Sequence, residues 1–274
     1  LIMDKNAPIG VFDSGVGGLT VAREIMRQIP NERIVYFGDT ARVPYGSKSK
    51  DNIIKFSRQI IRFLQTENVK AIVIACNTAS ALALDEMQQE FDLPILGVVK
   101  PGAKVAVETT ANKRIGLIGT EANIRSGVYT RYIKSLDDEA KVFEKACPLF
   151  VPLVEEGWLH DDITLQVASR YLEELKEKDI DTLIMGCTHY PLIRSTIRKV
   201  MGDKVNLVNP AYETAIELKN LLERDNLANK CDVDSPSSMY RFYVSDAEEK
   251  FKLFANSILP FDITMTKQIN IENY

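Results

Sequence analysis

The sequence predicts an α/β protein built from two similar, doubly wound parallel-sheet domains that face each other. Short apolar runs rich in β-branched residues alternate with segments of helical apolar spacing, which is typical of parallel sheets covered by helices. One pattern also occurs twice: residues 69–80 read V-K-A-I-V-I-A-C-N-T-A-S, and residues 180–191 read I-D-T-L-I-M-G-C-T-H-Y-P. Each copy is a buried strand that ends in a cysteine and a polar pair. Because open α/β sheets bind ligands at the carboxyl ends of their strands, we expect two facing half-sites.

Composition narrows the class of protein. The chain has 274 residues, of which 45% are hydrophobic and 26% charged, and its formal net charge is −4. This balance favours no nucleic-acid partner. Since no apolar run approaches the about 20 residues of a membrane span and no leader pattern is evident, we expect a cytoplasmic protein that is neither secreted nor bound to a membrane. The cysteines, at positions 76, 147, 187 and 231, form no C-x-x-C pair and fit free thiols in a reducing compartment.

The first half begins with a strand followed by D-S-G-V-G-G, residues 13–18. Such a turn can present backbone N–H groups to an anion, although a tight turn that merely needs glycine is an equally good interpretation. The strands expected in this half are 8–12, 33–38, 71–75 and 95–98. The helices expected here are 19–29, a helix capped by Ser49 or Asp51 that runs to about 65, and 79–90.

The second half repeats this plan after an expected break at Pro101-Gly102, which a helix to about residue 110 follows. Its first strand ends in Gly119-Thr120, much as the chain's first strand ends before Asp13-Ser14. The strands expected here are 114–119, 141–145, 182–185 and 205–208. The helices are 124–135, 163–178 and one that starts at Pro191.

The last part of the chain should return to the first half. We expect a helix over 211–224 packed against that half, a polar loop over 225–239, a strand over 241–244 and a helix over 247–258. The predicted domains are therefore residues 4–98 plus 210–258 and residues 99–209, with 259–274 as a C-terminal tail.

The chemistry centres on Cys76 and Cys187. A thiol acts as a base or nucleophile when it is a thiolate, and a helix N-terminus lowers a cysteine pKa. Asp13 and His189 could assist as proton-accepting or orienting partners, whereas His160 is expected at a surface helix end. Zinc ligation and a redox disulfide both lack the usual spacing, so we expect neither a metal nor a cofactor. A single cysteine nucleophile would leave its twin unexplained, but proton transfer by two bases on opposite faces of a carbon acid uses both.

The motifs D-S-G-V-G-G, D-T-A-R-x-P-Y-G, A-C-N-T-A-S and G-C-T-H-Y-P, in this order, closely resemble the bacterial glutamate racemases. The resemblance covers about residues 9–255 and implies the Asp/Glu racemase fold, with the substrate between two α/β halves. It implies a cofactor-independent isomerase that interconverts L- and D-glutamate and supplies the D form for peptidoglycan, cell-wall biogenesis and cell shape. It also implies that Cys76 deprotonates D-glutamate and Cys187 deprotonates L-glutamate.

The resemblance places further roles on this sequence. An assisting glutamate falls on Glu155, although the neighbouring Glu156 leaves that assignment ambiguous by one residue. The implied substrate-binding residues are Asp13, Ser14, Tyr45, Gly46, Asn77, Thr78, Thr188 and His189. Hydroxyls, amides and helix N-terminal N–H groups among them suit a carboxylate, Asp13 could meet the ammonium, and the loop amides at 45–46 could hold the side-chain carboxylate.

Two other functions stay open at this point. The same mechanism could act on aspartate or another carbon acid, and a two-lobed ligand-binding module could lack turnover. The expected partner in the first case is a small-molecule substrate, L- or D-glutamate. The sequence does not decide between a monomer and a homodimer.

Overall fold

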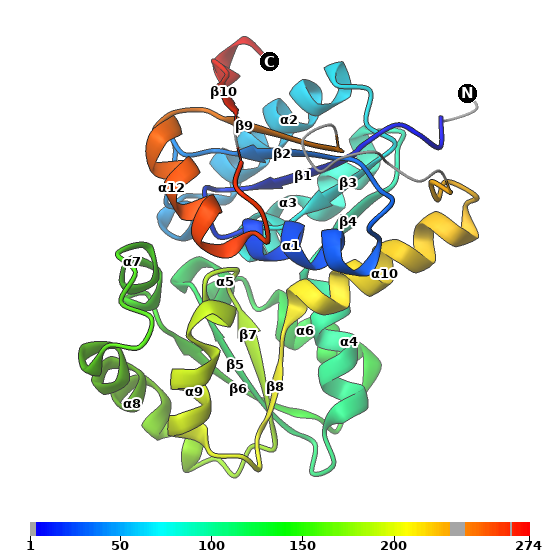
Figure 1. Ribbon diagram of the computed structural model, residues 1–274. Helices are drawn as coiled ribbons and strands as arrows, with labels where there is room; N and C mark the ends of the chain where they lie inside the picture. Colours follow the sequence, from blue (N-terminus) through cyan, green and yellow to red (C-terminus); the bar gives the residue numbers. More distant parts are fainter. Residues whose placement is uncertain (1–3, 231–238, 264) are drawn as a thin grey trace.

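The computed structural model describes residues 4–230, 239–263 and 265–274, and it contains two separate parallel sheets stacked end to end (Figure 1). The larger sheet has the strand order β10-β9-β2-β1-β3-β4, and the smaller has the order β6-β5-β7-β8. The strands of the larger sheet are β1 (Ile9–Asp13), β2 (Ile34–Gly38), β3 (Ala71–Ile74), β4 (Ile95–Gly97), β9 (Tyr240–Val244) and β10 (Thr266–Gln268). Those of the smaller sheet are β5 (Arg114–Gly119), β6 (Lys141–Ala146), β7 (Thr182–Gly186) and β8 (Asn206–Val208). The predicted fold class is confirmed.

Helices cover both faces of each sheet, because side chains along a strand alternate between its two faces. In β1, Ile9 and Val11 pack on one face with α1, α10 and α12, while Phe12 packs on the other face with α2 and α3. In the smaller sheet, α7, α8 and α9 cover one face, and α4 and α6 cover the other. The α-helices are α1 (Leu19–Gln28), α2 (Lys50–Thr66), α3 (Asn77–Glu90), α4 (Val99–Thr109), α5 (Glu121–Ser126), α6 (Val128–Leu136), α7 (Phe150–Glu155), α8 (Asp162–Lys176), α9 (Arg194–Met201), α10 (Pro210–Arg224) and α12 (Glu248–Ile258). The 3₁₀ helices of the described residues are η1 (Tyr45–Ser47), η2 (Tyr190–Ile193) and η3 (Ile271–Asn273).

The expected break at Pro101-Gly102 is wrong, because both residues lie in the first turns of α4. Proline is tolerated there since the first helical N–H groups have no partner within the helix. A Cβ on Gly102 would lie 2.9 Å from the ring of Pro210, so glycine allows α4 and α10 to approach closely. The two halves therefore pack together at the point where the sequence suggests an interruption between secondary-structure elements.

Two predicted helices differ in the structure, and three elements were not predicted. The helix expected over 124–135 is divided into α5 and α6 at Gly127, whose φ is +62°. The helix expected from Pro191 begins as the 3₁₀ turn η2 and becomes α-helical at Arg194. The helix α7 and the tail elements β10 and η3 were not predicted.

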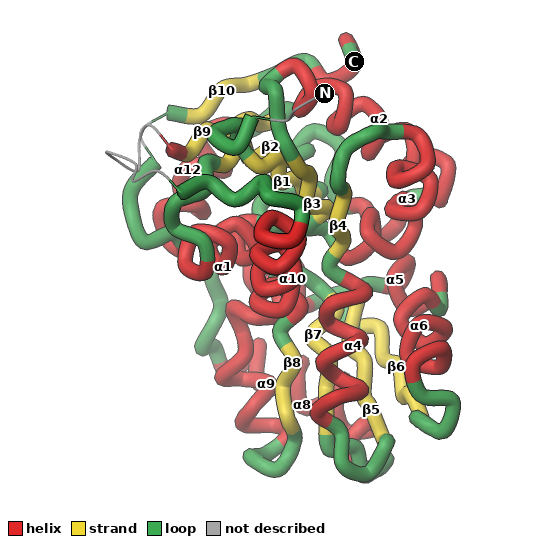
Figure 2. The backbone as a smooth tube through the Cα atoms, turned by 90° about the vertical axis from the view of Figure 1, so that its right-hand side faces the viewer, coloured by secondary structure: helices red, strands yellow, loops and turns green. Residues whose placement is uncertain are grey.

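The helix α10 contacts α1 of the first half and α4 of the second, and the tube view in Figure 2 shows it lying between them. Sheet membership follows the proposed division of the chain, except that β10, from the tail, joins the larger sheet. The domain bounds themselves stay a prediction. None of the helices in the described residues has the length and apolar character that crossing a membrane requires.

Candidate active site

A cavity of about 430 Å³ lies between the two sheets and is lined by residues from both halves. Four strands, two from each sheet, end beside it: Ser14 follows β1, Thr120 follows β5, and the two cysteines come just after β3 and β7. Its polar lining side chains and glycine are Ser14, Tyr45, Gly46, Ser47, Cys76, Asn77, Thr78, Thr120, Glu121, Glu155, Cys187, Thr188 and His189. The structure thus brings every predicted site residue except Asp13 to one cavity.

Cys76 occupies the N-cap position of α3 and is almost buried, with 6% of its surface exposed. Its Sγ lies 3.8 Å from the hydroxyl of Ser14. Burial, followed by the nearby charge of Asp13, raises its pKa to about 12, even though the backbone N–H of Ala79 and the Ser14 hydroxyl act in the opposite direction. The amide at the start of α3 lowers this pKa, as expected, but desolvation outweighs it, so Cys76 is a thiol.

Cys187 has a different surrounding, because His189 stands beside it. The Sγ of Cys187 lies 3.7 Å from Nδ1 of His189, and Nε2 of the same ring lies 3.1 Å from Oε1 of Glu155. Burial alone would lower the pKa of His189, but its hydrogen bonds to Cys187 and Glu155 raise that pKa to about 10. The hydrogen bond from His189 holds the pKa of Glu155 below its usual range. It is thus Glu155, the first of the two adjacent glutamates, that contacts the imidazole.

Asp13 lies behind the cavity wall and is fully buried. The N–H of Gly15 donates to its Oδ2 at 3.0 Å, while Oδ1 has no hydrogen-bond partner in the described structure. Burial raises the pKa of Asp13, although the charge of His189 and backbone N–H groups of its own loop counteract that effect. The amides of the Gly-rich turn therefore face the carboxylate of Asp13.

The glycines of this turn also permit close contact between the halves. A Cβ on Gly17 would lie 2.4 Å from Oγ1 of Thr188 and 2.5 Å from the ring of His189, which are impossible separations for real atoms. A Cβ on Gly18 would lie 2.4 Å from Cβ of Asp13. Close packing explains why glycine stands at both positions.

Hydrogen bonds cross the cleft at three places. The hydroxyl of Tyr129 on α6 donates to Oδ1 of Asn77 at 2.7 Å. The hydroxyls of Thr78 and Thr120 lie 2.9 Å apart, and the hydroxyl of Thr20 donates to the backbone oxygen of Thr188 at 2.9 Å. The polar side chains of each half are therefore placed by contacts with the other half.

Sequence reasoning missed Thr120 and Tyr129. The signal for Thr120 was present, because Gly119-Thr120 ends its strand as Asp13-Ser14 follows the first strand. Tyr129 gave no signal, since its ring sits within an ordinary amphipathic helix. His160 is exposed and contacts only Ser195 among the hydrogen bonds of the described residues, at 3.4 Å, in agreement with its expected surface position.

The remaining cysteines lie elsewhere. Cys147 is fully buried among the core residues of the second half, outside the cavity wall, and burial raises its pKa to about 12. Cys231 lies outside the described residues. In the part of the chain that the structure describes, no three or more His, Cys, Asp or Glu side chains are grouped so that they could hold a metal ion.

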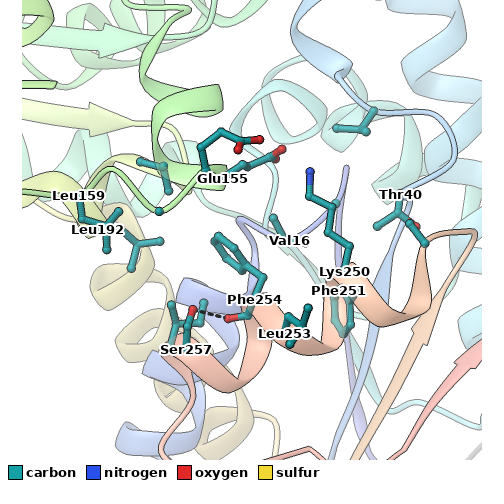
Figure 3. A pocket seen from close by; sticks show the side chains of 17 residues that line it. Val16, Thr40, Glu155, Leu159, Leu192, Lys250, Phe251, Leu253, Phe254 and Ser257 are labelled. Carbon is teal, nitrogen blue, oxygen red and sulfur yellow. Dashed lines mark hydrogen bonds between the residues drawn. The ribbon is translucent and has the colours of Figure 1, made fainter. Parts of the chain in front are cut away.

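A second cavity, of about 640 Å³, adjoins the first and shares Val43 and Glu155 with it. Its walls are mainly apolar and come from α7, α12 and the loop after β1, with Lys250 on one side of the opening and Glu155 on the other (Figure 3). The charge of Lys250 is a minor contribution to the lowered pKa of Glu155.

Comparison with known proteins agrees with this geometry. The family model described as Asp/Glu/hydantoin racemase matches residues 9–216. The chain is 44% identical over 264 residues to a glutamate racemase of Geobacter metallireducens, covering 96% of this chain and 97% of that protein. The structure of glutamate racemase isoform RacE1 from Bacillus anthracis superposes with a TM-score of 0.92 at 39% identity, covering 97% of this chain and 98% of that one. The glutamate racemase of Francisella tularensis, solved in complex with D-glutamate, has a TM-score of 0.91 at 38% identity, with coverages of 98% and 100%. The chain therefore belongs to the Asp/Glu/hydantoin racemase family and is an isomerase.

Proposed function

We propose that this protein is a cofactor-independent glutamate racemase that interconverts L- and D-glutamate through two thiols. The observation that carries the proposal is the placement of Cys76 and Cys187 after corresponding strands of two facing sheets, in the wall of one cavity. A carbon acid held between them would present one face of its Cα to each thiol. The likeness to proteins named glutamate racemases supports the choice of substrate.

The cavity offers partners for the charged groups of glutamate. The side chains of Asn77, Thr78 and Thr188 can donate hydrogen bonds to the α-carboxylate, together with amides at the start of α3. The backbone N–H groups at Tyr45 and Gly46 suit the side-chain carboxylate. Ser14 lies on the cavity wall where the ammonium can meet its hydroxyl, with the buried carboxylate of Asp13 behind it.

Proton transfer from L-glutamate then runs in two balanced steps. The thiolate of Cys187 removes the Cα proton and becomes a thiol, which leaves a carbanion delocalised into the α-carboxylate. The thiol of Cys76 gives its proton to the opposite face of Cα and becomes a thiolate, which produces D-glutamate. His189, which its raised pKa keeps protonated near neutral pH, can stabilise the thiolate of Cys187 through their hydrogen bond, and Glu155 orients the imidazole.

The raised pKa of Cys76 favours this direction, because it keeps Cys76 protonated as the acid. For D-glutamate the roles exchange, and Cys76 must act as the thiolate. Binding the substrate ammonium beside Cys76 would favour that thiolate, because an opposite charge stabilises the ionised form. Asp13, whose charge acts on Cys76 and whose Oδ1 has no hydrogen-bond partner among the described residues, would accept the displaced proton.

The decisive experiment follows the circular dichroism of an L-glutamate solution after the purified protein is added without cofactor. We expect the signal to decay to zero, and we expect the same from the D enantiomer. In deuterated water, solvent deuterium should appear at Cα mainly in the product enantiomer, because one thiol removes the proton and the other returns a different one.

Two outcomes would contradict the proposal. Label that enters recovered substrate as quickly as product would mean that one base serves both faces. Turnover of aspartate in place of glutamate would keep the mechanism and change the substrate. A role in supplying D-glutamate for peptidoglycan in the cytoplasm is part of the proposal, and rescue of a D-glutamate-requiring bacterial strain by this chain would test it.

A further inference from the structure

The C-terminal segment of the chain is attached to the larger sheet next to the loop that follows β2. Strand β10 pairs with β9, and η3 packs against α2. Ile271 is buried in the core between the sheet and α2, and the ring of Tyr274 meets that of Phe63 edge-on, with centroids 5.4 Å apart. These contacts hold the side chain of Glu272, which lies between Ile271 and Tyr274 in sequence, close to residue 42.

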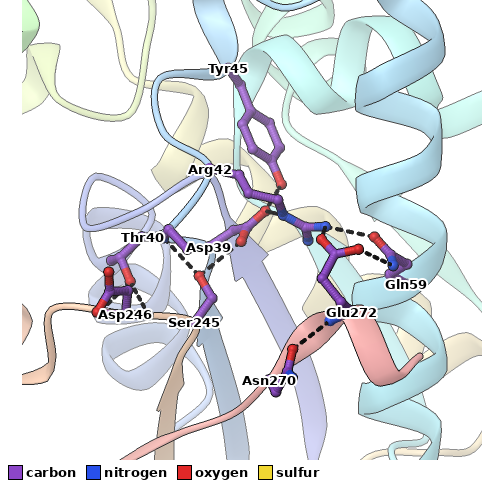
Figure 4. Close-up of polar contacts among 10 residues, drawn as sticks. Asp39, Thr40, Arg42, Tyr45, Gln59, Ser245, Asp246, Asn270 and Glu272 are labelled. Atoms are coloured by element: carbon purple, nitrogen blue, oxygen red, sulfur yellow. Dashed lines mark hydrogen bonds and ion pairs between the residues drawn. The ribbon is translucent and has the colours of Figure 1, made fainter.

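Arg42 is the residue that Glu272 contacts. Its Nη1 lies 3.0 Å from Oε1 of Glu272 and 2.6 Å from Oε1 of Gln59, and Nε2 of Gln59 donates to the other oxygen of Glu272 at 3.3 Å (Figure 4). The guanidinium also lies over the ring of Phe56, 4.1 Å from its centroid. The outer edge of the Arg42 guanidinium is thus fixed by a carboxylate from the end of the chain.

The inner edge of the same guanidinium contacts the loop after β2, which carries Tyr45 and Gly46. Nε of Arg42 donates to Oδ2 of Asp39 at 2.7 Å, and the hydroxyl of Tyr45 donates to that same oxygen. The other oxygen of Asp39 accepts from the hydroxyl of Ser245 at 2.9 Å. Since Tyr45 and Gly46 line the cavity, a continuous series of contacts joins Glu272 to the cavity wall through Arg42 and Asp39 (Figure 4).

We propose that Glu272 is a positioning residue for substrate binding, which fixes Arg42 and through it the loop that carries Tyr45 and Gly46. The inference rests on the proposed function, in which this loop holds the side-chain carboxylate of glutamate. Asp39 is completely buried, so its carboxylate needs the guanidinium of Arg42 as a partner. Glu272 is about half exposed, with 57% of its side chain accessible, so it adjusts the placement of Arg42 and the fold does not depend on it.

The test is Glu272→Gln in the full-length protein, with KM and kcat measured for both enantiomers. We expect KM to rise by about two- to fivefold, as suits a partly exposed ion pair, with kcat within about a factor of two of wild type. The effect should shrink at high salt, because salt screens the wild-type pair. Glu174→Gln is the matched control: Glu174 forms an ion pair with Lys145 at 2.8 Å, its side chain is 59% exposed, and it lies outside the cavity wall.

A double-mutant cycle with Arg42→Lys tests whether Glu272 acts through Arg42. Lysine keeps a charge near Asp39 but lacks the forked group that also reaches Glu272. We therefore expect Glu272→Gln to raise KM no further in the Arg42→Lys background. Thermal unfolding shows whether each variant is folded. If Arg42→Lys does not fold, the salt dependence of KM in Glu272→Gln alone still tests the role of Glu272.

Each outcome has one meaning. An unchanged KM in Glu272→Gln, an equal change in Glu174→Gln, or fully additive effects in the cycle would overturn the role of Glu272 while wild-type racemisation stands. Absence of glutamate racemisation by the wild-type protein would instead overturn the proposed function.

Discussion

Each cavity cysteine follows a strand of its own sheet, so the two thiols serve opposite faces of one substrate carbon in the proposed reaction. We expect Cys76→Ser and Cys187→Ser, made separately, to lower turnover in both directions by about a hundredfold or more. Each direction needs one thiolate as base and the other thiol as acid, and serine is a far weaker base near neutral pH. Stopped assays with each enantiomer measure the two directions.

The matched control is Cys147→Ser, because this thiol is buried but lies outside the cavity wall. Among the described residues it donates only to the backbone oxygen of Lys145, at 3.7 Å. Its turnover should stay near that of wild type, with at most a modest loss of stability. A large fall in its activity without unfolding, or a cavity-cysteine variant that loses only one direction, would contradict the assignment.

His189 gives a pH dependence of stability. Its pKa is raised from 6.5 to about 10 on folding, so its stabilising contribution is complete below pH 6.5 and is lost as pH rises toward 10. We expect the free energy of unfolding to fall between pH 6.5 and 9, with a slope of at most about 1.4 kcal/mol per pH unit. His189→Asn should lose this slope in urea unfolding measured across that range.

We limit the pH range to 9 because the ionisation of Cys76 also lowers the free energy of unfolding above that pH. Burial raises the pKa of Cys76 from 9.0 to about 12, so the folded state resists a deprotonation that the unfolded chain undergoes. Equal slopes for wild type and His189→Asn between pH 6.5 and 9 would show that the imidazole does not titrate as proposed.

At the scale of single elements, apolar periodicity predicted most strands and helices, whereas local backbone details were beyond it. The division of α5 from α6 depends on a left-handed Gly127, and the continuity of α4 through Pro101 depends on the proline being in the first turn. The strand β10 has only three residues and is exposed over most of its surface, so it carries no apolar pattern. Tertiary pairing with β9 creates it.

One buried ion pair joins separate elements at the other end of the larger sheet. The side chain of Lys70, just before β3, has no exposed surface, and its Nζ lies 2.5 Å from a carboxylate oxygen of Glu32. The same ammonium donates to the backbone oxygens of Lys5 and Leu227, at 2.6 and 2.8 Å. It therefore connects the N-terminal segment, β3 and the loop after α10.

We expect Lys70→Met to lower the free energy of unfolding by about 3–5 kcal/mol, because the buried carboxylate of Glu32 loses its cation and keeps a hydrogen bond from the N–H of Asn229. Urea unfolding near neutral pH measures the loss. Turnover per folded molecule should stay near wild type, since residue 70 precedes β3 and Cys76 follows it. A loss below about 1 kcal/mol would mean that water reaches the Glu32 carboxylate.

At the scale of the whole molecule, the active geometry depends on how closely the halves approach. The repeated cysteine pattern predicted two facing sheets and the cavity residues next to it. It could not predict Tyr129 or the position of Asp13 behind the wall, because these depend on the packing of one half against the other. Among the glycines that face the other half, Gly17 leaves the least space for a Cβ.

Gly17→Ala should therefore lower kcat/KM for both enantiomers by about tenfold or more, because the added methyl displaces His189 or separates the halves. Gly15→Ala, in the same loop, is the control, since its Cβ would meet only Val43 at an ordinary 3.6 Å. Racemisation kinetics and thermal unfolding of both variants check this. Comparable kinetics for Gly17→Ala and Gly15→Ala would mean that the halves adjust without cost.

The unequal surroundings of the two thiols, one beside His189 and the other beside Ser14, carry a thermodynamic restriction. Mirror-image amino acids have equal free energy in water, so the equilibrium constant of their interconversion is one. The ratio kcat/KM must then be identical for L- and D-glutamate, however different the two sides of the pocket are. If the imidazole lowers KM for one enantiomer, it must also lower kcat for that enantiomer. The enantiomer with the lower KM therefore has the lower kcat, in the same proportion.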